Sequence, residues 1–396
     1  QGGVGLAAGL IATLIWGFAQ MRTSLSAIIS RHYGAQTINR IKSLIPQALV
    51  VTILTGIILA ILLGINYDNV SHFLYGDINA MTYTFSENYF TIRLYGLPLG
   101  LLIALFFGIF RGFQNTYWAM YISVIGGLSN IFLDYILVLG VDNFISPMGV
   151  KGAAWASVIS QILMTILCVV FYLSKTPFNF KIRYKLNPFF KEMILIFVNM
   201  FVRTMVLNFV FIISNRYANS YGSNSLAAYT IGYNIWIFSA FFIDGYSNAG
   251  NALAGKYMGE KNNEKLKKLG NTLLKINIKI ALALMTVYGL LYPLIGKVFN
   301  SNENVIEIFE NIFWIVILAQ PFNSIAFTFD GIFKGLGKAV DLRNTLIIGT
   351  FLFFIPTIYL LDLIIPQLIS VWIALSIWML YRGISLLVKF RKIVNS

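Results

Sequence analysis

The chain has 396 residues, of which 58% are hydrophobic and only 11% are charged. An ordinary soluble domain has about 45–50% apolar and about 25% charged residues, so the composition excludes a soluble globular protein and a disordered one. The net charge of +14 does not indicate a nucleic-acid-binding protein, because the basic residues lie between long apolar runs. One cysteine excludes an internal disulfide, and two histidines disfavour a His-rich metal site. We therefore expect an all-α polytopic membrane protein.

Eleven apolar ranges are candidates for membrane spans, because a bilayer core about 30 Å thick needs about 20 apolar residues per helix. These runs are continuous, whereas the strands of a membrane barrel would alternate in polarity. In chain order the predicted spans are 3–30, 44–66, 89–110, 119–139, 149–173, 193–217, 226–255, 273–295, 312–333, 346–364 and 368–388.

Lysine and arginine concentrate in every second connection between these spans and at the C-terminal end. The positive-inside rule places such connections in the cytoplasm. We therefore predict a multi-pass protein of the cell inner (plasma) membrane with a cytoplasmic C-terminus. The first predicted span then begins outside, so we expect a further helix to precede it.

An internal repeat links the two halves of the chain. The segment 31–34 followed by 39–42 recurs as 256–259 followed by 264–267. Gly-Ile-Phe-Arg-Gly at 108–112 recurs as Gly-Ile-Phe-Lys-Gly at 331–335, in the same order and at nearly the same offset along the chain. Six spans separate the matched segments, so both halves point the same way, as in transporters with parallel repeats.

The repeat predicts two six-helix lobes related by a parallel pseudo-two-fold axis. The first lobe is expected at residues 1–173 and holds helices two to six, because its first helix is predicted to be missing. Residues 174–192 are predicted to be a cytoplasmic linker, and residues 193–396 the second lobe with helices seven to twelve.

Ionisable residues inside membrane spans are costly, about 2.5–3.5 kcal/mol each at a helix centre, so they are candidates for function. Asn130 and Asp134 are four positions apart and share one helix face. Their oxygen atoms suit Na⁺, a buried carboxyl group equally suits a proton, and the third alternative is a structural hydrogen bond to a neighbouring helix.

Three more charged residues are candidates in the second lobe. Asp330 precedes the repeated glycine segment, and its counterpart in the first lobe is Phe107, which favours a specialised acid over a structural one. Asp244 lies near the middle of its span and is expected to interact with Arg203 on the preceding helix. That pair is either a polar feature of a cavity wall or a fixed structural bridge.

No catalytic signature occurs in the sequence. It contains no nucleophile elbow, zinc-binding His-Glu-x-x-His or phosphate-binding loop, so we predict no catalytic residues and no enzyme.

Several segments together resemble the multidrug and toxic compound extrusion (MATE) family, and in particular its DNA-damage-inducible F (DinF) branch. The resemblance covers almost the whole chain and keeps the order of the family's motifs. The matching segments are 110–116, 130–134, 149–157, 203–204, 226–228, 242–245 and 330–337.

The resemblance implies xenobiotic antiport, in which multidrug efflux of organic, often cationic, compounds is exchanged for H⁺ or Na⁺. It implies cation or proton coupling at Asn130, Asp134 and Ser157, which would be ligands of Na⁺ if Na⁺ is the ion. Asp330, Asp244 and Arg203 are second-lobe polar or substrate candidates. Where another branch has a glutamate on helix seven, this chain has Arg203, which argues against a second Na⁺ site of that kind.

The alternative within the same fold group is a flippase for lipid-linked sugars, which would need several arginines or lysines to hold a pyrophosphate. A membrane-embedded enzyme or a scaffold is disfavoured by the repeat and by the missing motifs. The expected partners are the lipid bilayer and small-molecule substrates, not nucleic acid, and the expected state is a monomer. No cofactor is expected besides the coupling ion.

Overall fold

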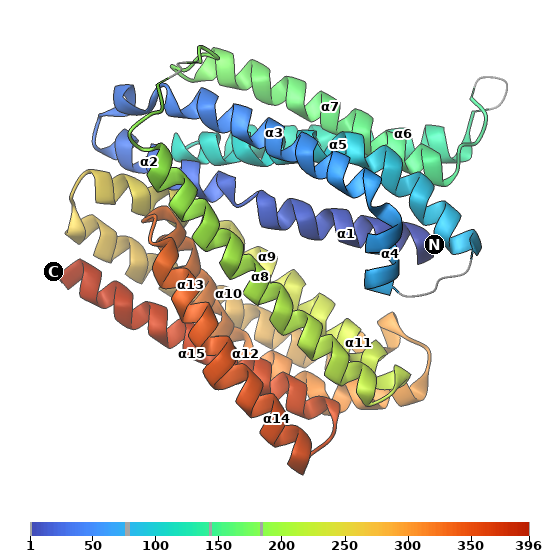
Figure 1. Ribbon diagram of the computed structural model, residues 1–396. Helices are drawn as coiled ribbons and strands as arrows, with labels where there is room; N and C mark the ends of the chain where they lie inside the picture. Colours follow the sequence, from blue (N-terminus) through green and yellow to red (C-terminus); the bar gives the residue numbers. More distant parts are fainter. Residues whose placement is uncertain (1, 76–79, 142–144, 183–184, 396) are drawn as a thin grey trace. The chain divides into compact units, whose positions relative to one another are not determined.

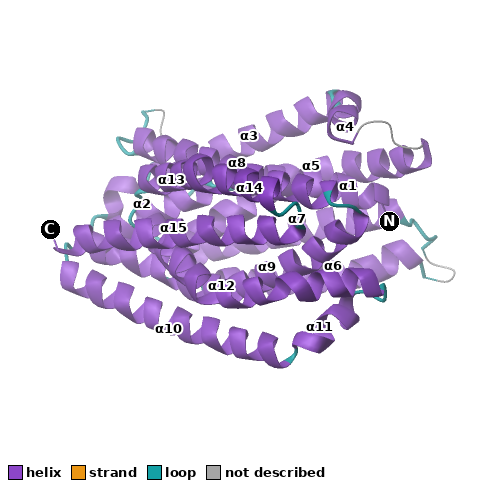
Figure 2. Cartoon of the chain, turned by 90° about the horizontal axis from the view of Figure 1, so that it is seen from below, coloured by secondary structure: helices purple, strands orange, loops and turns teal. Residues whose placement is uncertain are grey.

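The computed structural model describes residues 2–75, 80–141, 145–182 and 185–395, which form helices joined by short loops (Figures 1 and 2). Within these residues the β structure is limited to one isolated antiparallel bridge between Val141 and Ile145. The elements in chain order are α1 (Gly2–Phe18), α2 (Met21–Gly34), the 3₁₀ helix η1 (Ile38–Ile41), α3 (Leu44–Ile65), α4 (Tyr67–Tyr75), α5 (Ala80–Gly112), α6 (Tyr117–Leu139), α7 (Val150–Lys175), α8 (Phe190–Ser220), α9 (Ser223–Gly259), α10 (Asn263–Leu290), α11 (Tyr292–Phe299), α12 (Glu303–Gly335), α13 (Ala339–Ile348), the π-helical turn η2 (Gly349–Phe354), α14 (Ile355–Ile364) and α15 (Leu368–Asn395).

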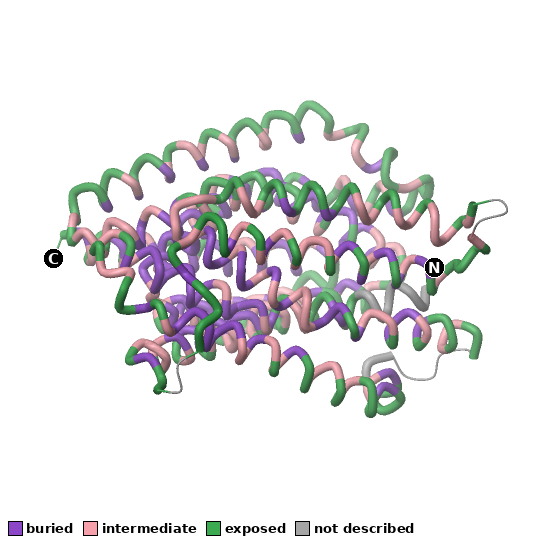
Figure 3. Tube along the Cα trace, turned by 90° about the horizontal axis from the view of Figure 1, so that it is seen from above, coloured by how far each residue is buried: buried purple, intermediate pink, exposed green. Residues whose placement is uncertain are grey.

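The helices have the length and composition that a bilayer requires. In the part of the chain that the structure describes, ten helical ranges are long and apolar enough to cross a membrane, and they correspond to the last ten predicted spans. Large apolar side chains such as Ile65 and Leu290 are exposed along them, and exposed positions continue along whole helices in Figure 3. Because lipid rather than water can cover such surfaces, the all-α multi-pass membrane fold is confirmed.

The first predicted span, 3–30, is not one continuous helix. It is divided into α1 and α2 at Ala19 and Gln20. The Gln20 side chain donates to the carbonyl oxygen of Trp16 and accepts from the Thr23 hydroxyl, so the break has its own polar partners. The predicted span joined two unlike segments, because α1 is almost entirely apolar whereas α2 begins with Arg22, Thr23 and Ser24 after Met21.

The chain divides into two compact units, which we describe separately. The first contains residues 1–32 and 36–195, and the second contains residues 33–35 and 196–396. The division in α8 lies close to residue 193, where the second lobe was predicted to begin. The linker predicted at 174–192 belongs to the first unit, where Asn187 donates to the carbonyl oxygen of Arg40 and to the hydroxyl of Ser43.

In the first unit, α5 packs against α1, α3 and α7, and α6 packs along α7. The tilted aromatic rings of Tyr67 and Phe90 have their centroids 4.7 Å apart in a core that also buries Ile11. In the second unit α12 occupies the equivalent central position and packs against α9, α10 and α15. Its core includes the stacked rings of Phe309 and Phe313.

The repeated glycines make the same helix contact in both units. A methyl group at Gly108 would overlap the backbone of Arg22 on α2, and one at Gly331 would overlap the backbone of Ser247 on α9. Arg22 and Ser247 are themselves related by the offset of the sequence repeat. Glycines four apart allow two helix backbones to approach closely, so the repeated motif is a packing motif.

The helix bounds follow the same repeat. Helices α5 and α12 have the same length, 33 residues, and each contains an interior proline, Pro98 or Pro321. Both helices end at the last glycine of the repeated segment, and α2 and α9 end at the matched glycines Gly34 and Gly259. The sequence repeat therefore reflects a repeated helix arrangement within each unit.

Candidate functional site

The acid predicted in the first lobe lies on α6 in a setting with few polar partners. Asn130 and Asp134 are one helical turn apart, and both side chains are half-buried. Among the described residues, neither Nδ2 of Asn130 nor Oδ1 of Asp134 has a hydrogen-bond partner, although both atoms are buried. Buried polar atoms are normally satisfied, so the unpartnered carboxylate oxygen of Asp134 in a membrane span is an acceptor for a proton, a water or an ion.

Ser157 lies on α7 at the level of this pair. Gly152 of α7 packs against the backbone of Leu137, and Met164 of α7 packs against Gly126 of α6. In the antiparallel register that these two contacts define, Ser157 is level with the turn between Asn130 and Asp134. The structure therefore brings the three predicted residues to one height on adjacent helices, while their role in coupling stays a prediction.

Asp330, in the second unit, has the opposite environment. It is 4% exposed, and its carboxylate is surrounded by cations from three helices. Oδ1 lies 2.5 Å from Nη2 of Arg203 on α8 and 3.8 Å from Nη2 of Arg382 on α15, and Oδ2 lies 2.6 Å from Nζ of Lys334 on α12. We refer to Asp330, Arg203, Lys334 and Arg382 as the charge cluster.

Packing at the repeated glycines positions the charge cluster. Gly331 and Gly335 hold α12 against α9, and Asp330 and Lys334 each precede one of these glycines. A spacing of four positions then places the carboxylate and the ammonium on one face of α12. On α15, the guanidinium carbon of Arg382 lies over the ring of Trp378, 4.5 Å from its centroid, in a cation–π contact.

The predicted partner of Arg203 was Asp244. The structure pairs Arg203 with Asp330, and it also places Asp244 close enough for its charge to act on Lys334 and Arg382. Asp244 thus lies beside the charge cluster, and its predicted interaction with Arg203 stays a prediction. The three second-lobe candidates therefore belong to one neighbourhood.

Sequence reasoning missed two members of the charge cluster. Lys334 was counted only among the basic residues of a connection, but it lies in the last turn of α12. Arg382 lies inside the last predicted span, and an arginine at that position is itself a signal of function that the hydropathy reading did not use.

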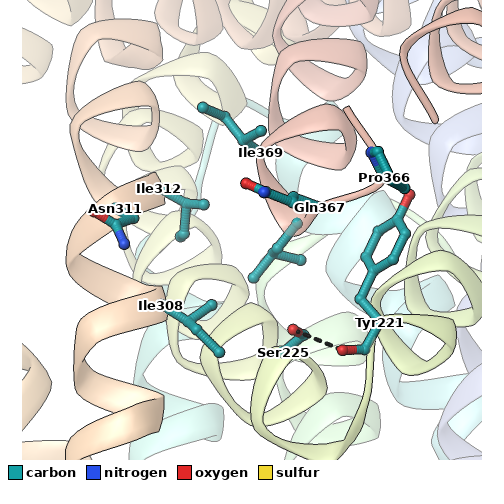
Figure 4. Close-up of a pocket in the computed structure, with 9 residues that line it drawn as sticks. Tyr221, Ser225, Ile308, Asn311, Ile312, Pro366, Gln367 and Ile369 are labelled. Atoms are coloured by element: carbon teal, nitrogen blue, oxygen red, sulfur yellow. Dashed lines mark hydrogen bonds between the residues drawn. The ribbon is translucent and has the colours of Figure 1, made fainter. Parts of the chain in front are cut away.

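A separate pocket lies at another part of the second unit. It has a volume of about 450 Å³ and is lined by residues near the N-terminal ends of α9, α12 and α15 and by the loops before α9 and α15, including Tyr221, Asn311 and Gln367 (Figure 4). The Tyr221 hydroxyl donates to Asp362 at 2.5 Å, and the Ser225 hydroxyl donates to the carbonyl oxygen of Tyr221. None of the predicted site residues lines this pocket.

Comparison with known proteins identifies relatives that match most of this chain. DNA damage-inducible protein F of Escherichia coli is 24% identical over 401 residues, which cover 99% of this chain and 84% of that protein. Protein DETOXIFICATION 43 of Arabidopsis thaliana is 28% identical over 303 residues, which cover 76% of this chain and 55% of the relative. The chain spans about half the length of this and similar curated plant relatives.

Solved structures share the fold. A crystal structure described as MATE in the bent conformation has a TM-score of 0.91 and 20% identity, covering 100% of this chain and 87% of that one. The outward-facing structure of a multidrug resistance MATE family transporter has a TM-score of 0.90 at 20% identity, covering 99% and 87%. The sequence pattern of the MatE family matches residues 2–136 and 200–360, so the chain belongs to the MatE family.

Proposed function

We propose that the protein is a secondary active exporter of organic, often cationic, compounds that exchanges them for H⁺ or Na⁺. Family membership supports transport across a membrane, and a relative named multidrug export protein MepA of Staphylococcus aureus is 23% identical over 318 residues, covering 78% of this chain and 68% of that protein. The observation that carries the coupling proposal is the buried carboxylate oxygen of Asp134, which lies in a membrane span and has no hydrogen-bond partner among the described residues.

The chemistry of this pair suits a reversible cation site. A charged carboxylate without a counter-ion is costly in the membrane, and binding a proton or Na⁺ removes that cost. Asp134 would supply the negative charge, and the side-chain oxygens of Asn130 and Ser157 would complete an oxygen-rich site. Because the free energy of binding depends on the environment of the acid, a change in lobe conformation would change the affinity and couple the ion to the substrate.

By contrast, Asp330 is a poor candidate for the coupling ion. Its carboxylate already interacts with three cations, so a further cation would compete with Arg203, Lys334 and Arg382. We therefore assign coupling to the first lobe.

Replacing Asp134 tests this proposal. We expect Asp134→Asn to keep the fold but to lose the dependence of ethidium efflux on an imposed pH or Na⁺ gradient in proteoliposomes. Asp341→Asn is the matched control, because Asp341 forms a half-exposed ion pair with Lys389 outside both sites. If Asp134→Asn exports ethidium with an unchanged dependence on both gradients, the assignment is wrong.

The second candidate function is a flippase for lipid-linked sugars. The charge cluster favours it, because arginine and lysine are suited to binding pyrophosphate. A flippase would move a fluorescent lipid-linked sugar between the leaflets of a vesicle without exporting ethidium, so the same proteoliposomes distinguish the two functions.

A further inference from the structure

The charge cluster holds more positive than negative charge. Arg203, Lys334 and Arg382 surround the single carboxylate of Asp330. Including the nearby Asp244, three cations face two acids, which leaves an excess of one positive charge in a membrane-spanning unit. Such an excess is costly away from water unless an anion compensates for it.

The guanidinium groups also have donors to spare. Arg203 is 7% exposed, and its Nε atom is buried without a hydrogen-bond partner among the described residues. Arg382 is 2% exposed, and within the described chain its hydrogen bonding consists of one bond from Nη1 to the thioether sulfur of Met379, a weak acceptor. Its separation of 3.8 Å from Asp330 is an ion pair without hydrogen-bond contact.

These donors are arranged for binding rather than for a closed structural bridge. The guanidinium of Arg382 lies over the ring of Trp378, and Arg203 is paired with Asp330. The side chain of Lys334 is 25% exposed, so the charge cluster is not sealed from its surroundings. Planar guanidinium groups with free N–H donors match the two oxygens of a carboxylate or the oxygens of a phosphate.

We propose that the charge cluster is a binding site for an oxyanion, a carboxylate or phosphate group of the transported compound. Arg382 and Arg203 bind the anion, Lys334 adds charge at the open side, and Asp330 holds the cations in place when the anion is absent. The oxyanion site rests on the proposed export function. It adds acidic or zwitterionic compounds to the proposed substrates.

Equilibrium binding tests the site without an ion gradient. The protein is placed in phosphatidylcholine nanodiscs, and phthalate or inorganic pyrophosphate is titrated by calorimetry. Phthalate represents a free organic carboxylate, and pyrophosphate represents the headgroup of a lipid-linked sugar. A parallel set of nanodiscs contains phosphatidylglycerol, so that competition by a membrane phosphate is also measured.

Two variants remove the proposed ligands one at a time. Arg382→Gln leaves Asp330 paired with Arg203 and Lys334, and Arg203→Gln leaves it paired with Lys334, so neither strands the acid. Each should weaken binding roughly 30-fold or more, since a buried charged partner of a bound ion is lost. Arg391→Gln on the same helix is the matched control because Arg391 is exposed, and Arg382→Lys should restore part of the affinity.

The outcomes are distinct. Phthalate or pyrophosphate binding that falls in both glutamine variants and not in Arg391→Gln supports the site, and competition by phosphatidylglycerol identifies a lipid phosphate as a source of the anion. No binding of either probe, or equal binding by all variants, overturns the proposal. Since Asp134→Asn should keep phthalate binding, a failure of ion-coupled ethidium efflux is separable from a failure of the oxyanion site.

Discussion

The stability of the second unit should depend strongly on the carboxylate of Asp330. Asp330→Asn removes the negative charge from a position that is 4% exposed and leaves Arg203 and Lys334, at 2.5 and 2.6 Å in the native protein, facing an amide. Removing one partner of a buried ion pair costs about 3–5 kcal/mol, because the remaining charge is left uncompensated. For a unit of this size that corresponds to a fall in melting temperature of about 6–20 °C.

The matched control is the same change at an exposed pair. Asp341 and Lys389 lie 3.2 Å apart with side chains 37% and 34% exposed, and such pairs contribute about 0–1 kcal/mol. The melting temperature of detergent-solubilised protein is measured by light scattering or by size-exclusion chromatography after heating. The double variant Asp330→Asn with Arg203→Gln should recover part of the loss, about 0.5–3 kcal/mol. An effect of Asp330→Asn no larger than that of Asp341→Asn, or a double variant less stable than the single one, would refute the reasoning.

Three further perturbations test other parts of the structure. Gly331→Ala should destabilise the protein by about 1–3 kcal/mol because its methyl group overlaps the Ser247 backbone, whereas Gly127→Ala meets nothing within 4 Å and should be neutral or stabilising in the same melting assay. Asn187→Ala should speed tryptic cleavage at Lys185 and Lys191, because Asn187 ties this segment to Arg40 and Ser43, and equal digestion rates would contradict this role. His32 lies beyond the predicted end of the first span. Burial and the neighbouring Arg31 hold its pKa below the ordinary histidine value of 6.5. As the pH falls, His32 of the unfolded chain therefore binds a proton before His32 of the folded chain does. His32 contributes stability above pH 6.5 that is lost as the pH falls towards the folded-state pKa. An NMR titration that gives His32 a pKa of 6.5 or higher in the folded protein would contradict this contribution.

Hydropathy predicted most of the helices because the bilayer sets their length. Ten of the eleven predicted spans correspond to single apolar helical ranges in the described chain. It did not predict the break at Ala19 and Gln20, because the range 3–30 was taken as one span although α2 is much less apolar than α1. At the break, Gln20 forms hydrogen bonds with Trp16 and Thr23.

The candidate sites were predictable to different degrees. Asn130 and Asp134 share a helix, so their spacing alone places them on one face. Arg203, Asp330 and Arg382 come from three helices, and their convergence depends on how each helix is rotated about its axis. Sequence spacing carries no information on that rotation, which explains why the ion pair of Arg203 with Asp330 was not predicted and why Arg382 was missed.

The two units share the same close helix contacts but differ in the charged residues beside them. The glycines that hold α5 against α2 recur where α12 meets α9, so these helices keep the same close contact. At positions where the second unit has Asp330 and Asp244, the first unit has Phe107 and Ala19. Glycine packing fixes the backbones and leaves the residues beside it free to differ, because a glycine contributes no side chain to the contact.

This division is the basis for the proposal that Asp134, and not Asp330, binds the coupling ion. Asp134 has a buried oxygen without a hydrogen bond among the described residues, so its charge state can change at little cost to its neighbours. Any cation that neutralised Asp330 would first have to displace Arg203 or Lys334. The two acids therefore respond oppositely to an added cation, and a transporter that binds its coupling ion in the first lobe can use the second lobe to recognise a group of the opposite charge.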